Sequence, residues 1–463
     1  MSYTPELSMD NNVDLRDAAE LQDLSQREAV PETATEQQEA GEAARQSLLP
    51  YDGGIAAWRM LVSAFVFEAL LWGFPLSFGV FQNYYSQLPQ FAGNPYVSVI
   101  GTTASGISYM GAPIIIPLIK RFTKYRNRMI WFGWPICILA LLAGSFAKTL
   151  GALIFTQGIM YGFGFVIFYY PIISMVNDFW IARRGMAYGL LCSASGVSGI
   201  VMPFAFEAML NKYGYQTTLR AVAGGLVVLT GPLIPLLKGR IPDSEVSVAA
   251  RTDWTFLRVH LFWIYNVSNF TQGMGYFFPS LYLPSYATAI GLSAKQGALL
   301  LAIMSVSQML GQMSFGYLSD RKLPLNLLIG LSTVMSTIAI FACWGLARTF
   351  TLLILFSIVY GYFGAGYSAM WARMGTAVSG DPTAAFAAFG VFNFGKGVGN
   401  VLAGPIGGSL VVDAVDKHRY AAMKFEGAVL FAGCCMLAST STLSLYYLKH
   451  LGGVIKTICN RGT

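Results

Sequence analysis

Long apolar runs separated by short polar loops constrain this 463-residue chain most strongly. A helix needs about 20 apolar residues to cross a lipid bilayer, and each run is close to that length. Only 11% of the residues are charged, whereas a soluble domain carries roughly 25%. A soluble core of this size could not hide so much apolar surface. We therefore predict an all-α membrane protein with twelve transmembrane helices, at residues 57–82, 97–119, 129–147, 151–176, 186–207, 219–237, 257–287, 296–318, 325–346, 350–372, 384–411 and 426–448.

Lysine and arginine are distributed unevenly among the loops, which predicts an orientation. The loops after the second, fourth, sixth and eighth spans hold several bases, such as Lys120 and Arg121 or Arg183 and Arg184. The loops between them hold one or none, except the loop before the last span, which holds three bases. Because short loops rich in Lys and Arg stay in the cytoplasm, we predict that both termini are cytoplasmic.

Polar segments divide the chain into domains. Residues 1–50 hold eleven acidic residues and three arginines, a net charge of −8, so the +7 of the whole chain leaves +15 for the remainder. This composition predicts a disordered acidic cytoplasmic tail. We expect two six-helix halves at 51–237 and 257–448, a cytoplasmic linker at 238–256 and a cytoplasmic tail at 449–463. The excess bases lie in short loops between apolar runs, so they indicate a lipid bilayer rather than nucleic acid as the partner.

Several motifs, in a fixed order along residues 52–412, carry a family resemblance. They are Asp52-Gly53-Gly54 before Trp58, Asp178-Phe179-Trp180 with Arg183 to Gly189, the charged hinge Gly316 to Lys322, and the glycine segments Gly397-Val398-Gly399-Asn400 and Gly404-Pro405-Ile406-Gly407. In these motifs the chain resembles the monocarboxylate porter family of the major facilitator superfamily, in its fungal branch. The resemblance implies two six-helix halves around a midplane site and transport by alternating access. The expected substrate is a small organic acid or an amphiphilic metabolite, and export of a fungal pathway product fits this branch.

The chain departs from the animal members of this family in the eighth span. Those members bear an aspartate and an arginine one turn apart, where this chain has Gln308 and Gln312. Residues one turn apart share a helix face. We predict that the two amides bind a polar, uncharged part of the substrate. Hydrogen bonding between neighbouring helices is the alternative.

Two charges fall inside predicted spans, where a charge is costly and marks a functional candidate. Lys396, in the eleventh span, is predicted to anchor an anionic group of the substrate. The alternatives are an internal ion pair or a place beside a wet cavity wall. Glu68, in the first span, is predicted to couple a proton to transport or to pair with Lys396. A protonated structural carboxyl is its alternative. Asn393 lies three residues before Lys396 and shares its face, so we assign it to the substrate site.

Aromatic residues and helix-end charges complete the candidates. Tyr161 and Tyr276 are predicted to line a substrate cavity, with packing as the alternative reading. Charged groups at the cytoplasmic helix ends are predicted to act in gating, by holding helices together in one state of the cycle. Their alternative role is to set the topology alone. The gating candidates are Asp320, Arg321, Arg183 and Arg184.

Other protein classes find little support in the sequence. No P-loop, nucleophile motif or zinc-spaced histidine cluster occurs, so we predict no enzyme, no cofactor and no metal site. A secondary transporter in the plasma membrane, with an organic small-molecule substrate and a co-transported proton, is the prediction. A sensor that binds a solute without moving it is the alternative from another class. Sensors usually need a long signalling tail, and only fifteen residues follow Leu448.

Overall fold

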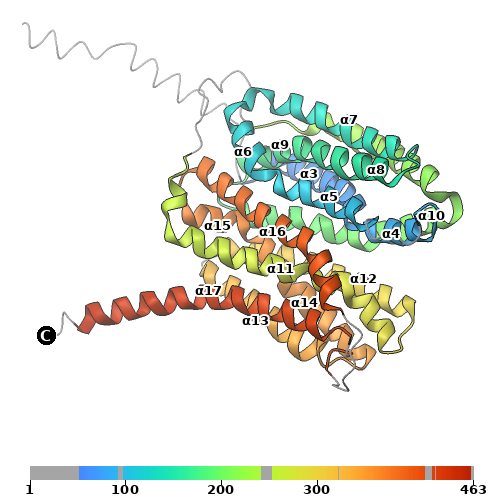
Figure 1. Cartoon of the computed structure of the whole chain (residues 1–463). Coiled ribbons are helices and arrows are strands. Elements are labelled where there is room, and N and C mark those ends of the chain that lie inside the picture. The colour runs from blue at the N-terminus through green and yellow to red at the C-terminus, as the bar shows by residue number, and fades with distance from the viewer. Residues whose placement is uncertain are drawn as a thin grey trace, which may run out of the picture. The chain divides into compact units, whose positions relative to one another are not determined.

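A computed structural model describes residues 52–91, 97–240, 253–321, 323–411, 420–422 and 424–459 (Figure 1). These residues belong to one compact unit, Pro50–Thr463, which is described here by itself. The predicted tail at 1–50, most of the predicted linker at 238–256 and the last four residues of the tail at 449–463 lie outside the described ranges.

Every secondary-structure element among the described residues is a helix. The first four predicted spans correspond to α3 with α4, α5 with α6, α7, and α8 with α9. Their bounds are α3 Gly54–Leu76, α4 Phe78–Gln87, α5 Ser98–Met110, α6 Ala112–Arg121, α7 Arg126–Gly144, α8 Leu150–Leu153, a π-helix at Ile154–Met160, and α9 Tyr161–Phe179. The fifth and sixth spans lie in α10, Arg184–Thr230, which is followed by a 3-10 turn at Gly231–Leu236.

The remaining predicted spans each coincide with one helix or with two in succession. The bounds are α11 His260–Ala289, α12 Ala294–Ser319, α13 Leu325–Ile338 with a π-helix at Ala339–Trp344, α14 Phe350–Ala369 with α15 Trp371–Val378, α16 Pro382–Leu410, and α17 Glu426–Cys459. Helix α17 thus continues past residue 448, where the sequence predicts a tail.

Length and hydropathy identify fewer spans than the sequence predicts. In the described ranges, eight helices are long and apolar enough to cross a membrane, or nine if α5 and α6, bent by 41°, count as one span. Helix α10 counts once although Gly214, with φ 74°, turns the chain inside it and separates the two predicted spans. Helices α11 and α16 fall outside this group because α11 carries buried polar residues and α16 is rich in glycine.

Two corners of the fold repeat one another. Residues 147–149 read Ala-Lys-Thr and residues 347–349 read Ala-Arg-Thr, and in each case the threonine hydroxyl caps the helix that follows. The carbonyl of Ala147 accepts a hydrogen bond from the Tyr215 hydroxyl at 2.9 Å, and that of Ala347 accepts one from Tyr286 at 3.0 Å. The same turn, with a capping threonine and a tyrosine bound to the alanine carbonyl, therefore joins the third segment to the fourth and the ninth to the tenth.

Helices α5 and α10 connect the first six segments to the last six. Helix α5 packs against α16, and α10 packs against α12. In Figure 1 most of α3 to α9 is drawn above most of α11 to α17, with α16 beside α5. Large apolar side chains such as Ile114, Phe132 and Val228 stay exposed on the outside, as a protein solvated by lipid requires.

Candidate transport site and gate

Lys396 is a buried cation surrounded by aromatic rings. Its side chain is 4% exposed, and its Nζ lies 3.6 Å from the ring centre of Tyr276, 5.2 Å from that of Trp371 and 5.7 Å from that of Phe277. Ring faces attract cations, and more strongly away from water. Within the described part of the chain the ammonium makes no hydrogen bond and no ion pair. The predicted alternative of an internal ion pair is therefore not formed in this structure.

Glycines bring the backbone at Lys396 close to its neighbours. A Cβ added to Gly273 of α11 would lie 3.2 Å from the Lys396 Cα, and one added to Gly399 would lie 2.5 Å from the Gly273 carbonyl. On another side of α16, a Cβ on Gly397 would lie 2.8 Å from the Tyr109 Cβ of α5. The glycine motif that carries the family resemblance thus lets α16 pack tightly between α11 and α5.

Glu68 is a buried carboxyl of the same region. It lies on α3, is 4% exposed, and accepts a hydrogen bond from the Tyr169 hydroxyl of α9 at 2.8 Å. The hydrogen-bond partner of Glu68 is thus a tyrosine from the first six segments. The predicted pairing of Glu68 with Lys396 is absent from the described contacts. The Cys192 thiol of α10 lies within electrostatic range of both Glu68 and Lys396, so the two charges belong to one central region.

Aromatic rings line the side of this region formed by the first helices. Trp72 packs against Tyr109 with ring centres 4.6 Å apart and against Phe165 at 4.7 Å, and Phe165 packs against Tyr169 at 4.9 Å. Tyr161, predicted to line the cavity, is instead fully buried, and its hydroxyl donates to the Leu71 carbonyl at 2.7 Å. Of the two predicted tyrosines, the structure brings Tyr276 to Lys396 and uses Tyr161 for packing.

The predicted amides differ in their surroundings. Asn393 is buried, and its Nδ2 donates to the Phe389 carbonyl of its own helix at 2.9 Å. Gln312 is buried, and its Oε1 finds no hydrogen-bond donor among the described residues. Gln308 is partly exposed. An unsatisfied buried carbonyl oxygen leaves Gln312 able to accept a hydrogen bond from a ligand.

The predicted gating residues lie at the start of α10 and just after α12, near the end of α6. We call this end, which holds the bases Lys120, Arg121, Arg183, Arg184 and Arg321, the basic end. Asp320 accepts hydrogen bonds from the backbone N–H of Gly185 at 2.9 Å and of Met186 at 2.7 Å. Helix N-termini bind carboxylates in this way. The Nε of Arg373 lies 3.5 Å from Asp320 Oδ1. Burial raises the pKa of Asp320, although the two backbone hydrogen bonds and Arg373 act against this rise.

The predicted gating arginines have other contacts. Arg184 donates through Nε to the Trp180 carbonyl at 3.3 Å, and the Arg321 guanidinium lies 4.5 Å from the Tyr317 ring centre. The side chain of Arg183 is exposed. The link between α10 and α12 is therefore a carboxylate on a helix N-terminus, because the backbone N–H groups lie nearer to Asp320 than these side chains do.

Sequence reasoning missed several residues of this region. Asp52 accepts from the backbone N–H of Ile181 at 2.9 Å and of Ala182 and Arg183 at 2.8 Å. The place of Asp52 in the Asp-Gly-Gly motif was the sequence signal that could have identified this role. Arg373 and Trp371 follow the break between α14 and α15 at Met370, which neither a proline nor a charge motif marks in the sequence.

Helices α10 and α12 approach closely from the basic end inward. A Cβ added to Gly189 would lie 2.5 Å from the Gln312 carbonyl oxygen, and one added to Gly196 would lie 2.9 Å from the Met309 Cβ. Small residues permit such backbone contacts in membranes. The Tyr188 ring of α10 also packs against Phe389 of α16, with centres 5.1 Å apart. The basic end is thus closed in this structure.

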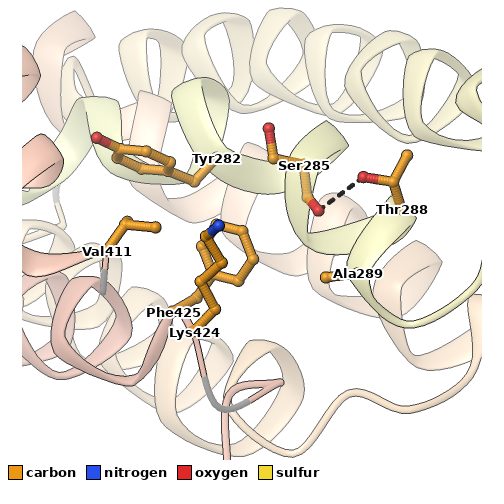
Figure 2. A pocket seen from close by; sticks show the side chains of 7 residues that line it. All are labelled: Tyr282, Ser285, Thr288, Ala289, Val411, Lys424 and Phe425. Carbon is orange, nitrogen blue, oxygen red and sulfur yellow. Dashed lines mark hydrogen bonds between the residues drawn. The ribbon is translucent and has the colours of Figure 1, made fainter. Parts of the chain in front are cut away.

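A separate hollow lies near the opposite ends of the later helices (Figure 2). It has a volume of about 420 Å³ and none of the predicted site residues lines it. Thr288 there donates to the Ser285 carbonyl at 2.8 Å. The lining residues are Tyr282, Ser285, Thr288, Ala289, Val411, Lys424 and Phe425.

A helical membrane fold with a buried lysine and a buried carboxyl in its central region and a closed end is what a solute transporter requires. Comparison with known families agrees: the Major Facilitator Superfamily profile matches residues 96–404. The chain belongs to this superfamily, whose members are secondary transporters. The predicted family and fold class are confirmed.

Relatives with assigned names are distant but extend over most of the chain. An MFS-type transporter of Aspergillus niger, pynF, is 26% identical over 88% of this chain and 93% of its own length. The aspyridones efflux protein of Emericella nidulans is 24% identical over 82% and 78%. Monocarboxylate transporter 12-B of Danio rerio is 27% identical over 87% and 91%. The resemblance to monocarboxylate porters and to fungal transporters thus extends beyond isolated motifs.

Among solved structures, the human organic anion transporter MFSD10 has a similar fold. The TM-score is 0.63 at 13% identity, and the match covers 84% of this chain and 99% of that chain. At this identity the likeness concerns the fold alone.

Proposed function

We propose that this protein moves an anionic organic metabolite across the plasma membrane, in the direction of export, with Lys396 as the anion anchor. The observation that carries the proposal is the buried ammonium of Lys396, which has rings around it but no anionic partner among the described residues. A buried charge normally has an ionic or hydrogen-bonding partner. An acidic substrate supplies that partner.

The proposed site extends from Lys396 to the neighbouring polar groups. Tyr276 supports the ammonium, Asn393 lies one turn before it, and Gln312 offers an unsatisfied carbonyl oxygen. Gln308 lies one turn from Gln312, at the partly exposed side. Tyr161 acts in this scheme by packing. Export is supported by the names of two relatives, the aspyridones efflux protein and the fujikurins efflux protein of Gibberella fujikuroi.

Proton coupling is assigned to Glu68. Its carboxyl shares the central region with Lys396 and accepts a hydrogen bond from the Tyr169 hydroxyl. A proton on Glu68 leaves Lys396 as the uncompensated charge and so favours an anion in the site, whereas the ionised carboxylate opposes one.

Gating is assigned to the basic end, which we place in the cytoplasm with both termini because of its lysines and arginines. Asp320 on the N-terminus of α10 joins the two halves, proposed at 51–237 and 257–448, in the state closed to the cytoplasm. Arg183, Arg184 and Arg321 surround this contact and set its local positive potential. Separation of α10 from α12 at this end opens the inward-facing state.

The experiment is transport in proteoliposomes with and without a pH gradient. It compares a panel of organic acids with neutral metabolites of similar size. We expect Lys396→Gln to lower acid transport by about tenfold or more, because a hydrogen bond to a charged group contributes about 1.5–3 kcal/mol. Lys295→Gln removes an exposed lysine near the start of α12 and is the matched control. Transport of neutral metabolites alone, unchanged in Lys396→Gln, would refute the anion anchor.

A further inference from the structure

An exposed row of two cations and two aromatic rings connects α6 to α7 at the basic end. The guanidinium carbon of Arg121 lies 5.7 Å from the Phe122 ring centre, and that of Arg128 lies 5.3 Å from the Tyr125 ring centre. The two ring centres lie 6.4 Å apart. All four side chains are exposed. The three contacts therefore form one continuous surface, which we call the cation–ring row.

The positive charge of this surface has no acidic partner within the described ranges. Lys124, in the 3-10 turn between the two helices, adds a third exposed base. None of the three bases forms an ion pair or a hydrogen bond with another described residue. Residues 69–177 contain no acidic residue, and Asp178 is itself paired with Arg126 at 2.5 Å. Three uncompensated cations so close in the sequence favour a bound anion.

Bases at this end also serve the topology, but topology does not require their arrangement at the start of α7. This helix begins at Arg126 and carries Arg128 in its first turn, where it has no acidic residue. Its N-cap residue Tyr125 makes no side-chain cap hydrogen bond. Positive charge is unfavourable at a helix N-terminus, which normally attracts anions. The hinge after α12 differs, because there Asp320 precedes Arg321.

The exposed rings indicate that the anion belongs to a lipid. Trp131 and Phe132 follow Arg128 by about one turn and are exposed. Further along α7, Leu139 is exposed as well. Tyrosine and tryptophan gather at the level of the lipid head groups. A soluble anion needs none of these rings, whereas a phospholipid contacts the bases with its head group and the apolar side chains with its glycerol and acyl chains.

We propose that the cation–ring row, together with Lys124, binds the head group of an anionic phospholipid that carries a phosphomonoester. A guanidinium stacked on a ring keeps the N–H donors of its edge available, and these bind phosphate oxygens in pairs. A phosphodiester carries one negative charge, whereas a phosphomonoester carries up to two and compensates more of the three bases. This inference concerns the outside of the fold and does not depend on the anion anchor at Lys396.

The test is native mass spectrometry of the purified full-length protein in a neutral detergent, with dioctanoyl phosphatidic acid as the probe. The wild type should bind this lipid more tightly than dioctanoyl phosphatidylglycerol or phosphatidylcholine. Arg121→Gln, Lys124→Gln and Arg128→Gln should each lower the affinity for phosphatidic acid by about fivefold, the usual effect of one base at a charged membrane surface. Each single variant keeps two of the three bases, so its fold and orientation should be retained.

A combined variant away from the basic end is the matched control. Lys148→Gln, Lys212→Gln and Lys295→Gln together remove three exposed bases. Lys212 also lies over an exposed ring, with its Nζ 5.2 Å from the Tyr213 ring centre. The control should bind phosphatidic acid as the wild type does, whereas Arg121→Gln, Lys124→Gln and Arg128→Gln combined should lose the preference for it. Equal losses in the two triple variants would indicate a general charge attraction and overturn the inference.

Two comparisons of ligands test the assigned class. Glycerol 3-phosphate carries the same phosphomonoester without acyl chains, and we expect it to bind at least about tenfold more weakly than phosphatidic acid, because it cannot contact the exposed apolar side chains. Equal affinity would identify a soluble anion as the ligand and refute the lipid site. If phosphatidylglycerol binds as tightly as phosphatidic acid, one negative charge is sufficient and the phosphomonoester assignment is wrong.

Discussion

At the scale of single residues, the described part of the central region has one cation and one carboxyl, and each contacts aromatic residues. Lys396 lies over Tyr276, and Glu68 accepts from Tyr169. Neither charge neutralises the other among the described contacts. The two groups are therefore free to respond separately, Lys396 to an anion and Glu68 to a proton.

The role of Glu68 leads to a prediction on coupling. Glu68→Gln keeps an oxygen that accepts from Tyr169 but cannot release a proton. We expect the variant to fold and to move substrate at a rate that no longer depends on the pH gradient, as measured by proteoliposome flux. Tyr169→Phe is the contrasting variant. It leaves the carboxyl without its donor, at a cost of about 1–3 kcal/mol in stability. Flux through Glu68→Gln that still follows the gradient would exclude Glu68 as the coupling group.

The sequence predicted the charged residues of the site better than their partners. Lys396 and Glu68 stand out because a charge inside an apolar run is conspicuous in one dimension. Trp371 and Arg373 do not, because the break at Met370 that positions them arises from packing between helices far apart in the sequence. Tyr161 was assigned to the cavity because a helical aromatic residue has the same local pattern whether it lines a cavity or packs.

At the scale of elements, close helix contacts separate into two kinds. Gly311 of α12 faces the Tyr362 backbone of α14, within the later helices, and a Cβ there would overlap the Tyr362 carbonyl. Gly316, one and a half turns further along, faces α10, where a Cβ would lie 2.5 Å from the Gly185 carbonyl and the Gly189 Cα. Gly311 thus permits packing within the last six segments. Gly316 permits the contact between the last six segments and the first six.

This difference predicts distinct effects for two alanine substitutions. Gly311→Ala should lower thermal stability, because overpacking costs about 1–3 kcal/mol in any state of the cycle. Gly316→Ala should leave overall stability closer to the wild type and shift the protein toward opening at the basic end, since only the closed state contains its clash. Thermal unfolding and cysteine accessibility at the basic end distinguish the two. Gly330→Ala, with no atom within 4 Å of the added carbon, is the neutral control.

The run of helices was the part of the fold most readable from the sequence. Apolar length alone located the segments, because the bilayer fixes how long a spanning helix must be. Helix breaks were harder to locate. Met370 ends α14 inside a predicted span and is not preceded by the polar loop that marks most boundaries, whereas the turn at Gly214 falls in the polar segment predicted between the fifth and sixth spans. The continuation of α17 past residue 448 also has no signature in hydropathy.

At the scale of the whole molecule, the protein is closed at the basic end through contacts that join α10 to α12 and α16. Asp320 supplies the carboxylate of this closure, and burial raises its pKa above that of an ordinary aspartate. The closed state therefore holds a proton more readily than an open state in which Asp320 meets water. In the interval between the ordinary and the raised pKa, falling pH favours closure and rising pH weakens it.

That linkage can be measured with spin labels at Ile181 and Leu323, which are both exposed near the basic end. The short-distance population should grow as the pH falls through this interval and should level off below the ordinary aspartate pKa. Asp320→Asn has no charge to titrate, so its distance distribution should stay constant over the same range. If acidification instead shifts the wild-type distribution to longer distances, protonation of Asp320 does not favour closure and the proposed pH dependence is wrong.

The hydrogen bonds of Asp52 have a practical consequence for anyone who handles this protein. Its carboxylate accepts from three successive backbone N–H groups, and its own N–H donates to the Phe179 carbonyl at 2.8 Å. The point where the chain enters its first helix is therefore fastened to the same loop that Asp320 holds from the other side. A purification tag or fluorescent protein fused just before Asp52 would strain the hydrogen bonds between Asp52 and residues 179–183, so fusions belong at the other terminus.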